Sequence, residues 1–185
     1  ECKVMIQAEI DKKKQQLTVS KEIIYPYIYM DTVRITEIIL NLMSNSIKYT
    51  NDGGWIHCAI SQEEDEREGW CIQELTVSDN GIGMTREFQK HIYESFTRER
   101  SSTASGIAGT GLGMGIVKKL VDMMDGTIDL QSKVGEGTTF RVRIPCRIAT
   151  QEDTQPKTDE NIGNPEDLKG IRILLAEDND LNAEI

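Results

Sequence analysis

A single carboxylate followed by two glycines marks the end of a predicted strand. Residues 75–78 alternate apolar and polar side chains, as a half-buried strand does, and Asp79 follows where the alternation stops. A carboxylate there accepts a hydrogen bond from an amino group, such as the exocyclic amine of adenine, and no keto oxygen can supply one. Gly81 and Gly83 lack Cβ atoms, so their backbone can approach a flat ring or a phosphate closely. Taken alone, the stretch is more simply an Asn-Gly turn between a strand and a helix.

Three polar residues lie about one turn apart in the longest helical pattern. Asn41, Asn45 and Lys48 fall within roughly 60° of one another on a helix, and we place them opposite its apolar stripe. Asparagine is a poor helix former, so two on one ridge indicate a function. A neutral amide oxygen suits Mg²⁺ held between protein and phosphate, and a lysine neutralises phosphate charge. The alternative is a solvated helix face.

A run of alternating glycines precedes a second helical pattern. Residues 109–115 read Gly-Thr-Gly-Leu-Gly-Met-Gly, and backbone N–H groups at a helix N-terminus bind anions. The dinucleotide-binding pattern G-x-G-x-x-G fails because Met114 stands where its third glycine is required. The P-loop pattern fails because no Gly-Lys-Ser/Thr follows. The run is therefore a phosphate-binding loop of another kind or a flexible hinge.

Hydrophobic periodicity predicts the elements that must position these groups. We expect the end of a helix at residues 1–16, helices at 31–48, 85–91 and 111–125, and strands at 17–20, 27–30, 55–61, 70–78, 127–133 and 138–145. Asp31 and Thr85 are predicted N-caps, and Gly126 is the predicted C-cap of the last helix. The three lysines at 12–14 and an acidic hairpin loop at 63–69 are expected to be solvated. Residues 99–109 hold almost no large apolar side chain and predict a mobile loop.

The totals exclude some classes of protein. The 185 residues suit one domain of ordinary size and part of another. With 31 acidic and 21 basic residues the net charge is −10, which argues against nucleic acid as a partner but leaves a local nucleotide site open. The four cysteines lack metal-binding spacing and fit reduced thiols in the cytosol. We expect a soluble segment, since we find neither a signal peptide nor an apolar run long enough to cross a membrane.

The polar and glycine stretches occur in the order that is typical of a known family. They form an N box at 41–50, a first glycine box at 79–84 (Asp-Asn-Gly-Ile-Gly-Met), an F box at 93–96 (Tyr-Glu-Ser-Phe), a second glycine box at 109–113 and a closing Gly-Thr-Thr-Phe at 137–140. Over about residues 1–147 the chain resembles the catalytic, ATP-binding domain of sensor histidine kinases. That domain belongs to the superfamily that includes DNA gyrase and the MutL repair proteins.

The resemblance implies an α/β fold, a two-layer sandwich of a mixed, mostly antiparallel sheet with helices on one face (the Bergerat-type ATP-binding fold), with ATP and Mg²⁺ as cofactors. Asp79 would hold the adenine amino group with Thr139 supporting it through water, and Asn45 would hold Mg²⁺ beside Asn41. Residues 99–108 would form a lid over ATP. The other implied ATP-binding residues are Lys48, Tyr49, Gly81, Gly83, Met84, Phe96, Arg98, Gly109, Thr110, Gly111, Leu112 and Gly113.

The implied catalytic residues are Asn41, Lys48 and Arg98, of which Arg98 would reach the γ-phosphate. In the gyrase-like ATPases the position of Asn41 holds a glutamate that activates water, and asparagine cannot act as a general base. This favours phosphoryl transfer to a side chain over hydrolysis. We expect the acceptor histidine on an upstream dimerisation helix, because His57 and His91 lie in contexts that predict structural roles.

The end of the chain carries a second resemblance. Residues 173–179, Ile-Leu-Leu-Ala-Glu-Asp-Asn, are similar to the first strand of a response-regulator receiver domain, where an acidic pair, here Glu177 and Asp178, binds Mg²⁺. The implied organisation is an upstream helix end at 1–16, a catalytic domain at 17–147, a linker at 148–170 and a truncated receiver at 171–185.

This organisation implies a hybrid kinase whose phosphoryl group is relayed to an aspartate. Its partners would be the upstream dimerisation domain and a receiver domain or response regulator. The parent protein would be a homodimer. We expect this domain to be cytoplasmic, and the full-length parent could carry an inner-membrane anchor. We also expect residues 171–176 to pair with a sheet edge.

Two alternatives have specific features against them. A serine kinase of the anti-sigma type, from the same superfamily, is disfavoured by the F box and the receiver-like end of the chain. A non-catalytic nucleotide-binding module is disfavoured by the intact Asn45, Asp79 and both glycine boxes.

Overall fold

The computed structural model of the chain describes residues 2–94 and 111–154. Its helices are α1 (Cys2–Lys12), α2 (Thr32–Tyr49), α3 (Arg86–Gln89), α5 (Gly113–Met123) and the short 3-10 helix η1 (Glu152–Thr154). Its strands are β1 (Gln16–Glu22), β2 (Ile28–Tyr29), β3 (Trp55–Glu64), β4 (Trp70–Asp79), β5 (Thr127–Lys133) and β6 (Gly137–Ile148). No helix in these two stretches is long and apolar enough to span a bilayer.

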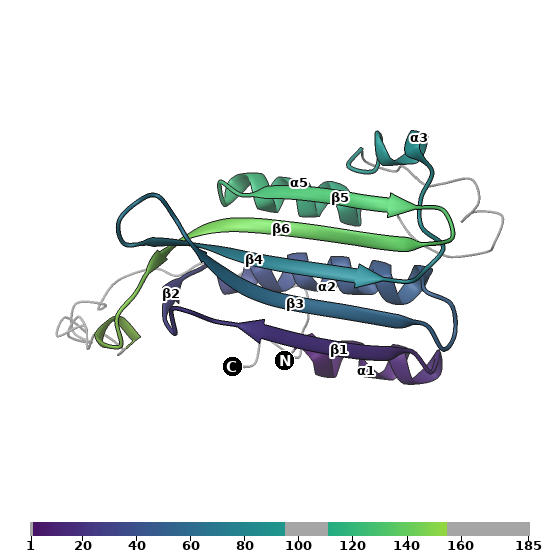
Figure 1. Ribbon diagram of the computed structural model, residues 1–185, viewed down its shortest axis with the longest axis horizontal. Helices are drawn as coiled ribbons and strands as arrows, with labels where there is room; N and C mark the ends of the chain where they lie inside the picture. Colours follow the sequence, from purple (N-terminus) through teal and green to yellow (C-terminus); the bar gives the residue numbers. More distant parts are fainter. Residues whose placement is uncertain (1, 95–110, 155–185) are drawn as a thin grey trace, which may run out of the picture. The chain divides into compact units, whose positions relative to one another are not determined.

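The strands form one mixed sheet in the order β1-β3-β4-β6-β2, and β5 also pairs with β6. Only β1 and β3 run parallel among the described strands, while the pairs β3–β4, β4–β6, β5–β6 and β2–β6 are antiparallel. In Figure 1 the sheet lies in front of α1, α2 and α5, which cover one face. The predicted fold class, an α/β sandwich with helices on one face of a mostly antiparallel sheet, is confirmed.

The core lies between the sheet and the helices. Along β4 the odd-numbered residues from Cys71 to Asp79 are buried, whereas the even-numbered residues face the other side. Helix α2 supplies Ile38 and Leu42, both with no exposed surface, and truncation of such a side chain to alanine typically costs about 2–5 kcal/mol. The alternation fixes which side chains of the sheet can meet the helices, and hence which can reach a site there.

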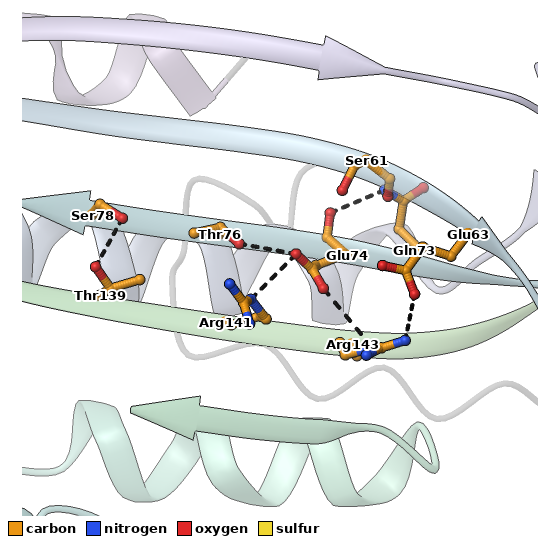
Figure 2. Close-up of polar contacts among 9 residues, drawn as sticks. All are labelled: Ser61, Glu63, Gln73, Glu74, Thr76, Ser78, Thr139, Arg141 and Arg143. Atoms are coloured by element: carbon orange, nitrogen blue, oxygen red, sulfur yellow. Dashed lines mark hydrogen bonds and ion pairs between the residues drawn. The ribbon is translucent and has the colours of Figure 1, made fainter. Parts of the chain in front are cut away.

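The other face of the sheet is polar. Figure 2 shows Glu74 of β4 between Arg141 and Arg143 of β6, and Arg143 also reaches Glu63 of β3 at 2.6 Å. These groups are open to solvent to varying degrees, so each pair contributes roughly 0–1 kcal/mol. The face is therefore well suited to water and needs no covering helix.

The helix N-caps agree with the prediction. Asp31 accepts hydrogen bonds from the N–H groups of Val33 and Arg34 at the start of α2, and Thr85 accepts one from Phe88 at the start of α3. Strand β5 spans the predicted residues, while β1, β3 and β6 are longer than predicted. The last strand was predicted to end at residue 145, but Cys146 is buried in β6 and that strand continues to Ile148.

The predicted C-cap at Gly126 is wrong. Helix α5 ends at Met123 with Met124 as its C-cap, and Asp125 is the residue that adopts the left-handed conformation, with φ +53°. A Cβ atom on Gly126 would lie 2.6 Å from the carbonyl oxygen of Arg143. The N–H of Gly126 donates to the carbonyl of Val121 at 2.9 Å, but the close passage of β6 is what excludes a side chain at this position.

Candidate nucleotide-binding site

The carboxylate of Asp79 is buried at the end of β4, facing the helices. Its Oδ2 accepts a hydrogen bond of 2.8 Å from the hydroxyl of Ser46 on α2, and its Oδ1 accepts one of 2.9 Å from the N–H of Gly81. Burial raises the pKa of Asp79, while hydrogen bonds from Gly81, Ser46 and the N–H of Thr138 oppose that rise. The result is an oriented acceptor held in an apolar setting, which is the requirement for reading an amino group.

The structure places Thr138, and not Thr139, beside Asp79. In the β4–β6 ladder Asp79 lies opposite Thr138, while Ser78 lies opposite Thr139. Figure 2 shows the hydroxyls of Ser78 and Thr139 meeting on the polar face, 3.0 Å apart. Because successive side chains of a strand point to opposite faces, Thr139 cannot support Asp79. The assignment of Thr139 is corrected to Thr138.

The first glycine box packs against the chain's own backbone. A Cβ atom on Gly81 would lie 2.4 Å from the carbonyl oxygen of Tyr49, and one on Gly83, where φ is +64°, would lie 1.9 Å from that of Lys133. Only glycine fits at these two positions, because the loop passes between the end of α2 and the end of β5 with no room for a side chain. Met84, half-buried against the core, follows directly, and the approach of a flat ring to these glycines stays a prediction.

The polar ridge of α2 faces the start of α5. The amide nitrogen Nδ2 of Asn45 lies 3.2 Å from the sulfur of Met114, and a Cβ atom on Gly113 would lie 2.7 Å from Oδ1 of Asn41. Gly111 and Leu112 lead into α5 just before this contact. The N box and the described part of the second glycine box therefore meet.

The prediction that the polar ridge lies opposite the apolar stripe of α2 is wrong. Asn41 and Asn45 are half-buried, and Ser46, the next residue, is buried within the stripe. On a helical projection Asn45 lies only about 20° from Ile38, so the ridge borders the stripe. This correction strengthens the site, because Asn45 and the Ser46–Asp79 contact occupy the same turn of α2.

Lys48 and Tyr49 end the same helix. The ammonium group of Lys48 lies 4.8 Å from the centroid of the Tyr49 ring, and both side chains are half-buried. A cation held over an aromatic face is oriented without being neutralised. Lys48 therefore keeps its positive charge available close to Asn41 and Asn45.

Both histidines have polar contacts of their own, and His57 lies opposite Ser78 in the β3–β4 ladder. His57 is on β3, where its ring nitrogens meet the hydroxyls of Thr18 at 2.7 Å and Ser20 at 3.2 Å. His91 is exposed and contacts Glu94 at 2.8 Å, which raises the pKa of His91. These contacts fit the structural roles predicted for both.

Two residues of the site were missed from the sequence. Ser46 is a hydroxyl at a position where the helical period demands burial, and that mismatch was the available signal. Thr138 could have been found from the alternation that buries Phe140 two residues later.

Several predicted residues lie outside the described part of the chain. They are Phe96, Arg98, Gly109, Thr110, the lid at 99–108, the strand at 171–176 and the acidic pair Glu177 and Asp178.

The chain matches one protein family model and many curated proteins. The model is that of histidine kinase-, DNA gyrase B- and HSP90-like ATPases, and it matches residues 30–148. The autoinducer 2 sensor kinase/phosphatase LuxQ of Vibrio vulnificus is 36% identical over 85% of this chain and 18% of that protein. The peroxide stress-activated histidine kinase mak2 of Schizosaccharomyces pombe is 30% identical over 95% of this chain and 8% of that protein. Hybrid signal transduction histidine kinase B of Dictyostelium discoideum is 37% identical over 76% of this chain and 7% of that protein.

Solved structures share the fold. Full-length ShkA in complex with AMPPNP superposes with a TM-score of 0.66 at 23% identity, covering 80% of this chain and 29% of that one. The catalytic domain of histidine kinase ThkA gives a TM-score of 0.62 at 22% identity, covering 78% of this chain and 88% of that one. On the family model and the sensor-kinase relatives together, the chain belongs to the histidine kinase-, DNA gyrase B- and HSP90-like ATPases and carries an ATP-binding catalytic domain of the sensor histidine kinase type.

Proposed function

We propose that this chain binds Mg·ATP and transfers the γ-phosphoryl group to a histidine on an upstream dimerisation helix. One observation carries the proposal: the buried Asp79 is oriented by Ser46, which follows Asn45 on the same turn of α2. An adenine acceptor and a candidate magnesium ligand thus lie on one side of the sheet. A placement on opposite faces would have contradicted the assignment.

The described residues suggest how the nucleotide is held. Asp79 would accept a hydrogen bond from the adenine amine, and the amide oxygen of Asn45 would help to hold Mg²⁺, which would offset phosphate charge. No group of three His, Cys, Asp or Glu side chains suited to a metal occurs within residues 2–94 and 111–154. Among the described residues we therefore propose the amide oxygen of Asn45 as the magnesium ligand, in keeping with sites where phosphates and water supply the other ligands.

Catalysis rests on positioning and charge neutralisation, as in other phosphoryl transfers. Lys48 and Arg98 offset the charge of the phosphates, with Asn41 beside them. Asn41 donates its Nδ2 to the carbonyl of Glu37 at 2.9 Å and offers no basic atom to water. This favours transfer to a side chain over hydrolysis. Phe96, the lid at 99–108 and the loop from Gly109 to Gly113 enclose the phosphates in this account.

The larger protein is proposed to be a hybrid kinase. The chain spans between 7% and 18% of the curated relatives described above, whose names include sensor and hybrid histidine kinases. We assign residues 17–147 to the catalytic domain, 148–170 to a linker and 171–185 to the start of a receiver domain, with Glu177 and Asp178 as its acidic pair. Relay to an aspartate, a homodimeric parent and a cytoplasmic location, with or without a membrane anchor, belong to the same proposal.

Phosphoryl transfer can be tested with radiolabelled ATP and a longer form of the protein that contains the upstream helices. We expect a label that is lost in acid and stable in alkali, because phosphohistidine has that pattern. A label stable in acid would indicate a serine kinase. Nucleotide binding without any label would indicate a binding module and contradict the proposal.

A further inference from the structure

The last turn of α2 is capped by the turn between α1 and β1. A helix ends with four backbone carbonyls that lack partners within the helix. The ammonium group of Lys13 donates to three carbonyl oxygens there, those of Ile47 at 2.8 Å, Lys48 at 3.1 Å and Thr50 at 2.8 Å. The side-chain amide of the buried Gln15 donates to Ile47 at 3.0 Å and Thr50 at 2.8 Å. The side chains of Lys13 and Gln15, from the turn between α1 and β1, therefore hold this helix end.

The same helix end is held from the nucleotide side. The carbonyl oxygen of Tyr49 accepts a hydrogen bond of 3.1 Å from the N–H of Ile82, in the first glycine box. Gly81 packs its backbone against that carbonyl. Ser46, one turn earlier, holds the carboxylate of Asp79. The turn of α2 that Lys13 caps therefore also contacts the adenine acceptor Asp79 and the first glycine box.

The contact singles out one lysine of three. Lys13 is half-buried, while Lys12 and Lys14 on either side are exposed. Among the side-chain hydrogen bonds in the described part of the chain, those to the carbonyls at the end of α2 come from Lys13 and Gln15 and not from Lys12 or Lys14. A positive charge at a helix C-terminus also interacts favourably with the helix dipole. The expectation that this lysine run is simply solvated is therefore wrong for its central member.

We propose that Lys13 is a positioning residue for nucleotide binding. It fixes the last turn of α2 against the α1–β1 turn, and so keeps Ser46, Asp79 and the backbone at Ile82 in the arrangement that accepts adenine. Through Lys13, the placement of α1 affects the affinity of the pocket. The proposal rests on the assignment of this pocket to ATP, and it adds a residue outside the family's sequence boxes.

The test compares three variants that each remove one positive charge: Lys13→Met, Lys12→Met and Lys14→Met. Binding of AMPPNP with Mg²⁺ is measured by calorimetry, and hydrogen exchange is measured at the amides of Thr50 and Ile82. We expect Lys13→Met to weaken binding by about fivefold, a usual size for a mutation that acts through an intermediate contact. It should also speed exchange at both amides, while Lys12→Met and Lys14→Met match the wild type and Lys13→Arg restores most of the affinity.

Other outcomes would overturn the proposal or separate it from the function. Equal weakening by all three methionine variants would assign the effect to overall charge and overturn it. A lower melting temperature with unchanged affinity and unchanged exchange would reduce Lys13 to a stability role and overturn it as well. If the wild type fails to bind AMPPNP, the ATP assignment fails. The exchange data alone then decide whether Lys13 fixes the last turn of α2. Should Lys13→Met not fold, Lys13→Gln, which keeps a donor without the charge, takes its place in the same comparison.

Discussion

At the scale of single residues, the orientation of Asp79 depends on Ser46. Burial raises the pKa of Asp79, and the Ser46 hydroxyl is one of the donors that oppose the rise. In Ser46→Ala the pKa should rise further, since a donor to the charged form is lost. Binding of ATP requires the acceptor form, so affinity should fall as the pH is lowered through this pKa. The midpoint of that fall should lie at higher pH in Ser46→Ala, and calorimetric titration at several pH values measures it.

The same raised pKa has an effect of known sign on stability. The folded state binds the Asp79 proton more tightly than the unfolded state, because the folded pKa is raised. Stability from this group is therefore present at low pH and is lost as the pH rises from the unfolded pKa through the folded one.

An affinity profile for Ser46→Ala with an unshifted midpoint would contradict the role given to Ser46.

Two neighbouring threonines provide a matched pair. Thr138 lies opposite Asp79, and Thr139 lies opposite Ser78 on the polar face. Thr138→Val keeps the backbone N–H that faces Asp79 and removes the hydroxyl, which meets that of Ser132 at 3.0 Å. Because the account gives that hydroxyl to the adenine site, ATP binding should weaken by roughly fivefold, the value of one hydrogen bond of about 1 kcal/mol. Thr139→Val should leave ATP binding unchanged, because it loses only its contact with Ser78. Dissociation constants of the two variants, measured side by side, check the register; the reverse order of effects would show that the original assignment of Thr139 was right.

The carboxylate, the glycines and the asparagines could be singled out from the sequence because each residue type has a restricted chemistry, and their roles toward ATP stay predictions. Thr139 was misassigned because the closing motif contains two adjacent threonines, and the type of a residue does not say which face of a strand it occupies. The alternation of burial along β6 decides the question. The role of Lys13 was not predictable, because its partners are backbone carbonyls 34 to 37 residues away.

At the scale of elements, the first glycine box is held by backbone contacts that leave no room for a side chain. In Gly83→Ala the new Cβ would lie 1.9 Å from the Lys133 carbonyl, at a residue with φ +64°. We expect a loss of roughly 3 kcal/mol or more in the free energy of unfolding, since a steric clash adds to the strain of a left-handed residue. Urea unfolding measures it.

Gly69 is the matched control for that change. Its φ is +78°, and a Cβ there would have no heavy atom within 4 Å. Gly69→Ala should therefore cost only the conformational strain, about 1–2 kcal/mol. Equal losses in the two variants would mean that the loop after β4 moves to accommodate a side chain, against the tight packing described here.

The helices and most strands could be predicted because their periodic patterns and caps are local. The ends of α5 and β6 could not. Glycine at 126 indicated a C-cap, but the close passage of β6 explains it. The last strand was predicted to end at residue 145, but cross-strand pairing continues β6 to Ile148. Pairing between distant segments set both boundaries, and no local pattern records it.

At the scale of the whole molecule, nucleotide binding should stabilise the folded state. A ligand that binds only the folded state stabilises it by about 2.7 kcal/mol at one hundred times its dissociation constant. AMPPNP with Mg²⁺ should therefore raise the melting temperature of the chain. Removal of Mg²⁺ with EDTA should shrink this shift, because in the proposed function Asn45 holds the phosphates through the cation. A shift that is unaffected by EDTA would contradict the metal role of Asn45.

The measurement that tests the account most directly is ATP affinity in Asp79→Ala, with Ser78→Ala as control. The two residues are neighbours on β4, but only Asp79 faces the helices. We predict that Asp79→Ala loses most of its ATP binding and its preference for ATP over GTP, while Ser78→Ala retains both. If Asp79→Ala remains folded and binds ATP as tightly and as selectively as the wild type, the adenine pocket does not lie at Asp79 and the account is wrong.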